Sequence, residues 1–255
     1  MEKQSMWRDR FTIRSYEVDV DYTIQFPVIC NYLQESAWHH ARNLSYGYFD
    51  LKRQNQLWVL SRIVIEIESL PVWDQTITVT TWPKGAERLF ALRDFRIHDH
   101  EEKLLGTATS FWLLLDGENK RPLKLDKFLE ESPILTDTHA LSERYKKIEI
   151  HPEQQASYIE EVRYSDLDQN NHVNYVEYIR WCLNSHTPNF HNTHLLRRFE
   201  INFRAEALFG DRIVVSADAI DDTTDTSGSV PTYYAVSRES DGQLLCNAKG
   251  FWDSY

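Results

Sequence analysis

Hydrophobic residues recur at helical spacing in two separate parts of the chain. The first run covers residues 26–37 and stops before Tyr46-Gly47, and the second covers residues 173–183 and stops before Thr187-Pro188. Segments rich in β-branched and aromatic residues follow each run. The pattern therefore predicts two units, each of which begins with a helix and continues into strands.

Short loops separate the strand-like segments within each half, which favours antiparallel pairing. The strands expected in the first half span residues 62–68, 75–81, 89–97 and 104–115, and those in the second half span residues 198–204, 213–219, 233–238 and 244–252. The halves also share sequence, because residues 104–112 and 244–252 are identical at five of nine positions, at an offset of 140. A duplicated unit explains this repeat better than chance does.

The repeat divides the chain into an N-terminal unit at residues 1–120, a linker at residues 121–155 and a C-terminal unit at residues 156–255. The linker is polar and charged and contains three prolines. It is too long for an ordinary loop, so we expect it to contain a short helix near residues 125–131. A long helix lying on a curved antiparallel sheet is the hot-dog architecture, and two such units in one chain would form an internal pseudo-dimer.

Composition and charge narrow the class of protein. Hydrophobic residues make up 42% of the 255 residues, which suffices for a buried core, and no apolar run is long enough to span a bilayer. The chain has 28 basic and 39 acidic residues, and this net charge of −11 argues against nucleic acid as a partner. We see no apolar segment typical of a signal peptide, and the three cysteines are too few and scattered for a disulfide framework. A cytoplasmic location is expected.

The strongest chemical signal lies just before the second predicted helix. Asp168, Asn170 and His172 stand at alternate positions, so an extended or turning segment can aim all three side chains at one point. A carboxylate can attack or act as a base, an imidazole can carry a proton, and a carboxamide can orient either group. The start of the helix near Val173 and Asn174 offers backbone N–H groups to an oxyanion. This is the equipment for acyl transfer, although helix capping by Asp168 and Asn170 would explain the same residues.

Only the second half carries this motif. The corresponding residues 21–27, before the first helix, include an Asp but neither Asn nor His. We therefore expect the second unit to be catalytic and the first unit to supply most of an acyl pocket. Ile29 and Leu33 on the first predicted helix are the candidates for the pocket wall, because they recur on its apolar face.

Residues 165–181 resemble the catalytic segment of the acyl-acyl-carrier-protein (acyl-ACP) thioesterases, the plant fatty-acyl thioesterases and their bacterial relatives. The family pattern D-x-N-x-H-V-N-N is matched up to Tyr175, which replaces the last Asn. Residues 203–207 match a second segment and carry Glu206, which the family counts among its catalytic residues. Ala207 stands where the plant members have cysteine, so a cysteine nucleophile at this position is excluded. The resemblance covers nearly the whole chain.

The resemblance implies an α+β double hot-dog fold and hydrolysis of fatty-acyl-ACP thioesters to a free fatty acid and the carrier thiol. Asp168 would attack the thioester or activate water, and the sequence leaves both routes open. Asn170 would hold a carbonyl or the water, His172 would polarise the substrate or relay a proton, and Glu206 would orient His172 or the water. Neither a cofactor nor a metal is expected.

Other interpretations of the same residues stay open. An acyl-CoA thioesterase, a non-catalytic acyl-binding hot-dog protein and a hot-dog dehydratase are the alternative functions. Cys182, on the second predicted helix, could pair with a histidine, but an ordinary buried thiol is the better interpretation. The histidines at 186, 191 and 194 could bind a metal, but they lack the spacing of a known metal motif.

The expected partner is an acyl carrier protein bearing a fatty acyl chain, and homodimer formation is left open. Carriers of this kind are strongly acidic, so a chain with a net charge of −11 needs a local basic patch for docking. The candidates are Lys52-Arg53, Lys84 with Arg88, Lys146-Lys147 and Arg197-Arg198.

Overall fold

A computed structural model describes residues 2–141, 147–150, 155–218 and 231–254 of the chain. The chain divides into two compact units, Met1–Arg144 (unit 1) and Tyr145–Tyr255 (unit 2), and each is described by itself. Among the helices in the described residues, none is long and apolar enough to cross a membrane.

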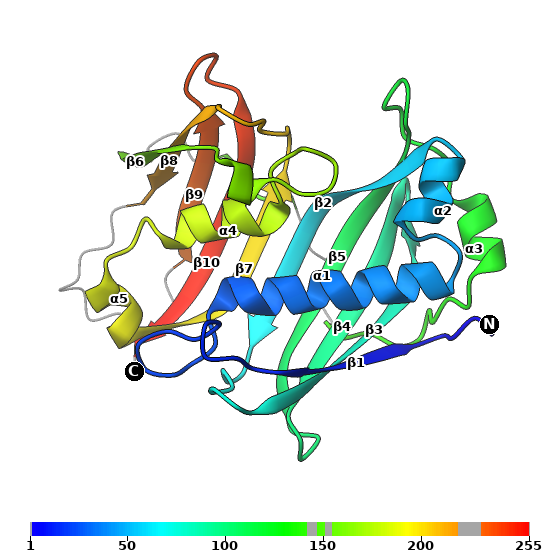
Figure 1. Ribbon diagram of the computed structural model, residues 1–255, viewed down its shortest axis with the longest axis horizontal. Coiled ribbons are helices and arrows are strands. Elements are labelled where there is room, and N and C mark those ends of the chain that lie inside the picture. Colours follow the sequence, from blue (N-terminus) through cyan, green and yellow to red (C-terminus); the bar gives the residue numbers. More distant parts are fainter. Residues whose placement is uncertain (1, 142–146, 151–154, 219–230, 255) are drawn as a thin grey trace. The chain divides into compact units, whose positions relative to one another are not determined.

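Unit 1 is a long helix on an antiparallel sheet (Figure 1). Its sheet has the strand order β1-β3-β4-β5-β2, and α1 packs against β1 and β3. In chain order the elements are β1 (Trp7–Thr12), α1 (Phe26–Asn43), α2 (Tyr48–Arg53), β2 (Gln56–Ile67), β3 (Thr76–Glu87), β4 (Phe90–His98), β5 (Leu104–Asp116) and α3 (Asp126–Glu131).

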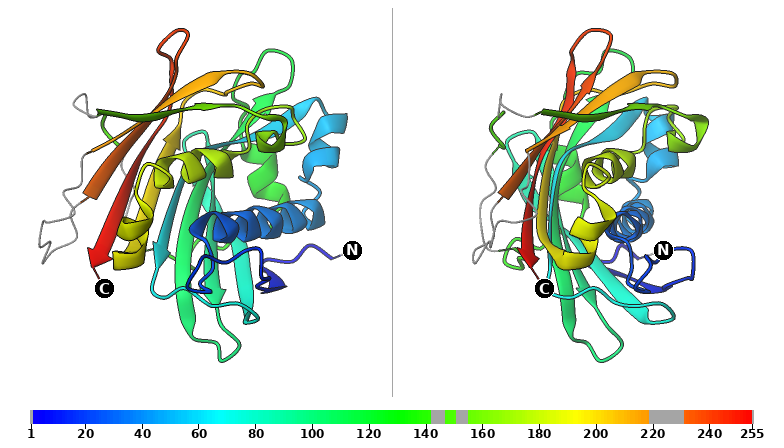
Figure 2. Two further views of the ribbon diagram at one scale, coloured as in Figure 1. Left: turned by 60° about the vertical axis from the view of Figure 1, so that its left-hand side comes forward. Right: turned by 90° about the vertical axis from the view of Figure 1, so that its left-hand side faces the viewer.

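Unit 2 repeats this arrangement with a shorter helix (Figure 2). Its sheet has the strand order β7-β10-β9-β8-β6, and α4 packs against β8 and β9. In chain order the elements are β6 (Gln155–Glu161), the 3-10 helix η1 (Tyr164–Asp166), α4 (Tyr175–Leu183), α5 (Pro188–Thr193), β7 (His194–Phe203), β8 (Arg212–Ala217), β9 (Pro231–Arg238) and β10 (Leu244–Ser254).

The duplication predicted from sequence is confirmed by the topology. In each unit the strand that follows the helix pairs with the last strand, which in turn pairs with the one before it. The repeated sequence segments lie in β5 and β10, each of which is the last strand of its unit and the second from the end of the sheet formed by the strand after the helix. The double hot-dog fold implied by the resemblance is therefore confirmed.

The two helices differ in length, and local sequence explains why. α1 runs for 18 residues and buries Ile29, Leu33 and Ala37 on one face. α4 ends after nine residues at Leu183. A separate short helix, α5, then begins with Pro188 after the Thr187 side chain caps it, because proline suits the first turn of a helix but not its interior.

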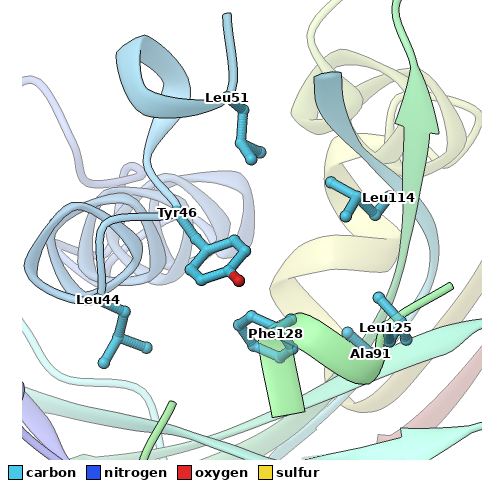
Figure 3. Packing of buried hydrophobic residues seen from close by; sticks show 7 residues of the cluster. All are labelled: Leu44, Tyr46, Leu51, Ala91, Leu114, Leu125 and Phe128. Atoms are coloured by element: carbon cyan, nitrogen blue, oxygen red, sulfur yellow. The ribbon is translucent and has the colours of Figure 1, made fainter. Parts of the chain in front are cut away.

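The expected short helix of the linker is confirmed as α3, and its apolar residues belong to the core of unit 1. Leu125 and Phe128 are 4% and 5% exposed and pack in one cluster with Tyr46, Leu51 and Leu114 (Figure 3). The rings of Tyr46 and Phe128 meet edge to face, with centroids 5.0 Å apart. The predicted linker segment therefore begins with residues that complete a hydrophobic core.

Candidate active site

The loop before α4 is folded around the carboxylate of Asp168. Its Oδ1 atom accepts the backbone N–H of Asn170 at 2.7 Å and that of His172 at 3.4 Å. Its Oδ2 atom accepts the carboxamide N–H of Asn170 at 3.3 Å. Asn171 lies in the left-handed region, with φ of 63°, which asparagine tolerates better than most residues. The loop therefore closes on itself and brings the side chains of Asp168 and Asn170 into contact.

The helix begins two residues later than the sequence pattern predicts. α4 starts at Tyr175, and Asn174 is the N-cap whose side-chain oxygen accepts a backbone N–H of the first turn at 3.1 Å. The N–H of Val173 donates to the carbonyl of Ala207 at 3.2 Å, and the N–H of Asn174 donates to that of Asp166 at 2.8 Å. These two N–H groups, which were expected to face an oxyanion, are therefore already used within the unit.

His172 and Glu206 form the second contact of the site. The Nε2 atom of His172 lies 3.3 Å from Oε2 of Glu206. The two side chains are 29% and 55% exposed, so the pair is accessible to solvent within unit 2. A carboxylate beside Nε2 favours the tautomer with its proton on that nitrogen, which leaves the Nδ1 lone pair able to accept a proton. The structure thus brings together Asp168 with Asn170, and His172 with Glu206, in one unit.

The segment that carries Glu206 is held by side chains as well as by backbone. The guanidinium of Arg238 donates from Nη2 to the carbonyl oxygen of Glu206 at 2.8 Å. The next peptide N–H, of Ala207, donates to the hydroxyl of Tyr178 at 2.9 Å. Sequence reasoning missed Tyr178 and Arg238, because a tyrosine on the apolar face of a helix and an arginine at a strand end carry no functional signal of their own.

The loop before α1 in unit 1 is built by the same hydrogen bonds. Asp19 Oδ1 accepts the N–H groups of Asp21 at 3.0 Å and Thr23 at 2.9 Å, as Asp168 does for Asn170 and His172. Tyr22, with φ of 60°, takes the place of Asn171. We call this shared pattern the loop frame, residues 17–25 in unit 1 and residues 166–174 in unit 2.

The loop frame also meets the segment just after the strand that follows the helix, and it does so in the same way in both units. The N–H of Ile24 donates to the carbonyl of Pro71 at 3.0 Å, as the N–H of Val173 does to that of Ala207. Leu70, the residue before Pro71, therefore corresponds to Glu206, the residue before Ala207. The counterpart of Asp168 is Asp19, while Asn170, His172 and Glu206 are replaced in unit 1 by Asp21, Thr23 and Leu70.

The other substrate-binding candidates lie away from this loop in sequence. Ile29 and Leu33 sit on the buried face of α1 in unit 1 and are 2% and 1% exposed. Their position on that face agrees with the helical periodicity from which they were chosen.

The thiols are buried within the fold and His186 is half-buried, and they are not arranged as a catalytic or metal site among the described residues. Cys30, Cys182 and Cys246 are buried thiols, and burial raises the pKa of Cys246 well above its ordinary value. Nε2 of His186 lies 2.6 Å from the hydroxyl of Tyr234, and burial lowers the pKa of His186 to about 3. Within the described part of the chain, no three His, Cys, Asp or Glu side chains come together as metal ligands.

Two helix-on-sheet units and the polar loop of unit 2 define a double hot-dog protein with an acid, amide and imidazole site. The chain belongs to the acyl-ACP thioesterase family. The N-terminal domain of that family matches residues 4–131, and its C-terminal domain matches residues 149–254.

Individual relatives agree with this placement. The chloroplastic acyl-[acyl-carrier-protein] hydrolase FATB3 of Cuphea viscosissima is 27% identical over 96% of this chain and 62% of its own length. The chloroplastic oleoyl-acyl carrier protein thioesterase 2 of Arabidopsis thaliana is 29% identical over 81% of this chain and 61% of its own length. The chain thus spans less than two thirds of these curated relatives. The crystal structure of an acyl-ACP thioesterase from Bacteroides thetaiotaomicron matches with a TM-score of 0.86 and 26% identity, over 98% of both chains.

Proposed function

We propose that the protein hydrolyses fatty-acyl-ACP thioesters to a free fatty acid and the carrier thiol. The observation that carries this proposal is the His172–Glu206 contact of 3.3 Å beside the Asp168–Asn170 contact, in a chain of the acyl-ACP thioesterase family. Imidazole, carboxylate and carboxamide together supply the base, its orienting group and a hydrogen-bond donor that thioester hydrolysis requires.

In the proposed reaction, His172 acts as the general base. Glu206 holds the proton on Nε2, so Nδ1 takes a proton from a water molecule as the water oxygen bonds to the thioester carbon. The resulting tetrahedral intermediate collapses, the C–S bond breaks, and the thiolate leaves with the proton that His172 had taken. The thiol is a good leaving group, because a free thiol has a pKa near 8.5.

Asp168 and Asn170 are assigned to positioning the loop and the substrate carbonyl. Both oxygens of Asp168 already accept hydrogen bonds from the loop, which favours an orienting role over attack on the thioester. The carboxamide of Asn170 is assigned to the negative charge that develops on the carbonyl oxygen, since the N–H groups of Val173 and Asn174 donate elsewhere. Side-chain contacts of Val173 and Asn174 with the substrate are part of the same proposal.

The proposal is tested with matched panels of acyl-ACP and acyl-CoA substrates of several chain lengths, with release of free thiol as the readout. The expected result is thiol release that is faster from the carrier than from CoA. Equal rates with both substrates would support the acyl-CoA thioesterase alternative. Release of an unsaturated thioester would indicate a dehydratase, and acyl binding without thiol release would leave only an acyl-binding protein.

The structure reduces the candidate basic pairs for carrier docking. Lys84 bonds the buried carboxylate of Asp94 at 3.0 Å. Arg197 pairs with Asp253 at 2.8 Å and Arg198 with Glu200 at 2.7 Å, so their charges are largely compensated. Lys146 lies outside the described residues.

Lys52-Arg53 has the most favourable surroundings for an acidic partner. Both residues are exposed on α2, next to a hollow of about 430 Å³ whose wall includes Arg42, Asp50 and the exposed ring of Phe49. Arg53 pairs with Asp50 at 2.6 Å, so Lys52 and the exposed Arg42 carry most of the positive charge offered here. Cations beside an exposed aromatic ring suit an acidic protein that also offers an apolar contact. We assign carrier docking to this surface.

Charge reversal tests the docking assignment. Lys52→Glu with Arg53→Glu is expected to raise KM for carrier-bound substrate several-fold, as added salt would, with little change in kcat. The matched control is Arg197→Glu with Arg198→Glu, which makes the same change of charge on strand β7 of unit 2. An equal rise of KM in both double variants, or no rise in either, would reject this surface.

The acyl chain is assigned to unit 1, with Ile29 and Leu33 in the pocket wall. A cytoplasmic location also stays a prediction, and the names of the plant relatives place those proteins in the chloroplast.

A further inference from the structure

The two copies of the loop frame separate general scaffolding from contacts that belong to one copy. Hydrogen bonds present in both units, such as those of Asp19 and Asp168, serve the fold, because unit 1 has them without the Asn, His and Glu side chains of the candidate site. Contacts present only in unit 2 are different, since the duplicated fold does not require them. Two of these unit-specific contacts converge on the peptide group that follows Glu206.

The first contact is made by Tyr178, the fourth residue of α4. Its hydroxyl accepts the N–H of Ala207 at 2.9 Å, and its side chain is buried, at 4% exposed. Both partners are changed together in unit 1. The fourth residue of α1 is Ile29, which has no hydroxyl, and the counterpart of Ala207 is Pro71, which has no N–H. The hydrogen bond is therefore an addition to the frame.

The second contact is made by Arg238 at the end of β9. Its Nη2 donates to the carbonyl of Glu206 at 2.8 Å, while Nε and Nη1 bond Asp211 at 3.0 Å and Asp241 at 2.8 Å. The two carboxylates fix the guanidinium plane, so Nη2 is aimed at one place. In unit 1, Asp99 stands at the same place after β4 and bonds only the N–H groups of its own turn in the hydrogen bonds described.

Together the two side chains hold both polar atoms of the peptide between Glu206 and Ala207. The carbonyl is held from β9 and the N–H from α4, the helix that the catalytic loop leads into. Because Glu206 follows β7 in a segment without regular structure, its backbone direction is not fixed by strand pairing. Backbone hydrogen bonds of Arg204, Ala205 and Ala207 hold the segment on either side, and in the hydrogen bonds described these two contacts are the ones made to the peptide group of Glu206 and Ala207 itself.

We propose that Tyr178 and Arg238 are positioning residues that hold the carboxylate of Glu206 against Nε2 of His172. This inference rests on the proposed thioester hydrolysis. The side chains touch neither the substrate nor the reacting atoms, and they act through the orientation of Glu206.

The test is a double-mutant cycle measured on acyl-ACP hydrolysis. Tyr178→Phe and Arg238→Gln are each combined with Glu206→Gln, and kcat and KM are compared with those of the single variants. Each single variant is expected to lower kcat about three- to tenfold at nearly constant KM, as loss of one aligned hydrogen bond would. In the Glu206→Gln background neither change is expected to lower kcat further, because the group they position is already altered.

Matched controls separate positioning from folding. Tyr158→Phe removes a tyrosine hydroxyl that donates to the carbonyl of Trp181 at 2.8 Å, and Arg212→Gln removes an arginine that pairs with Glu239. Both controls are expected to retain kcat. Arg238→Lys should restore part of the rate lost in Arg238→Gln, since it keeps a donor at this place.

The outcomes distinguish the inference from the proposed function. If Tyr178→Phe or Arg238→Gln lowers kcat by the same factor in the Glu206→Gln background as in the wild type, the positioning role is overturned. Unchanged kcat in both single variants would overturn it as well. In either case the proposed role of Glu206 in the reaction is unaffected. A Glu206→Gln variant with full turnover would remove Glu206 from the reaction and overturn the positioning role with it, while the proposed hydrolysis would stand; absence of thiol release from the wild type would overturn the proposed function. If all these variants release thiol at the full rate, the hydrolase activity is supported and does not require the contact between His172 and Glu206.

Discussion

The loop before α1 and the loop before α4 have the same backbone and different side chains. In each, one aspartate accepts two backbone N–H groups, one residue has a left-handed backbone, and one N–H reaches the segment after the next strand. Only the second loop has a carboxamide at the position of Asn170 and an imidazole at that of His172, and only its partner segment has a carboxylate at the position of Glu206.

This difference separates the features that both copies of the fold share from those that only the candidate site in unit 2 has. The aspartate of the loop frame serves the loop's own hydrogen bonds, because unit 1 keeps Asp19 while it has Thr23 in place of His172. The presence of Asp168 is therefore weak support for a chemical role of its carboxylate. The residues that differ between the copies, Asn170, His172 and Glu206, are stronger candidates.

The largest expected difference between the copies comes from removing the aspartate charge in each. Asp168→Asn places an amide opposite the amide of Asn170, disturbs its orientation, and is expected to lower kcat by about 100-fold, as misplacement of a catalytic group does. Asp19→Asn makes the same change in unit 1 and is expected to retain kcat. Thiol release and thermal unfolding are measured for both. A small and equal effect in both variants would reduce Asp168 to a folding role.

A second difference concerns acid stability and the buried polar residues of unit 1. His40 is fully buried, and Arg93 donates to its Nδ1 at 3.0 Å. Burial, with the charge of Arg93 adding to it, lowers the pKa of His40 to about 4, below its value of about 6.5 in the unfolded chain. Between these values the unfolded state binds more protons. The stabilisation is therefore complete above pH 6.5 and falls as the pH decreases toward 4, by about 3 kcal/mol.

Urea unfolding at pH 7, 5.5 and 4.5 measures this effect, with His40→Gln as the comparison. The variant should be less stable at pH 7 and should lose less stability on acidification than the wild type. His186 in unit 2 acts in the same direction in both proteins, because burial lowers its pKa to about 3. The same loss in the variant and the wild type would assign the acid sensitivity to other groups.

A third difference concerns the acyl chain. Ile29 and Leu33 lie on the buried face of α1, so enlarging either to Trp would fill space on the side assigned to the acyl pocket. The expected result is a preference for shorter chains in the acyl-ACP panel, with overpacking costing about 1–3 kcal/mol of stability. A chain-length profile that is unchanged in both variants would place the acyl pocket elsewhere.

The smallest expected effect is that of the thiols. Leu33 of α1 corresponds to Cys182 of α4, so the buried thiol stands where unit 1 has an ordinary apolar residue. Replacing Cys30, Cys182 and Cys246 by Ala should retain most turnover and cost a few kcal/mol of stability from lost packing. Loss of turnover in a folded Cys182→Ala protein would restore the case for a thiol nucleophile.

The sequence predicted the parts of the fold that depend on periodicity. The helix of unit 1 and the strands β3, β4, β5 and β10 followed from apolar spacing and β-branched runs. β1 and β6 were missed because they are edge strands with polar residues at alternate positions or at their ends, which resembles a solvated loop. α2 and α5 were missed because six residues are too few to show a helical period, and α3, which is equally short, was expected from the length of its linker instead.

The side-chain motif was visible in the sequence, but its frame was not. Residues 17–25 and 166–174 are identical only at Asp19 and Asp168, since backbone hydrogen bonds constrain conformation and leave most side chains free to change. The sequence comparison therefore began at residue 21 and did not align Asp19 with Asp168. Tyr178 and Arg238 were likewise invisible, because their partners are backbone atoms of a segment far away in the chain.

The central claim is that the same loop frame is chemically active in unit 2 and inactive in unit 1. The measurement that tests it most directly is the rate of thiol release from acyl-ACP by His172→Ala and by Thr23→Ala, which are equivalent positions of the two frames. With both proteins folded, His172→Ala is expected to be slower than the wild type by at least about 100-fold, and Thr23→Ala is expected to equal the wild type. Near-normal turnover of His172→Ala would contradict the account.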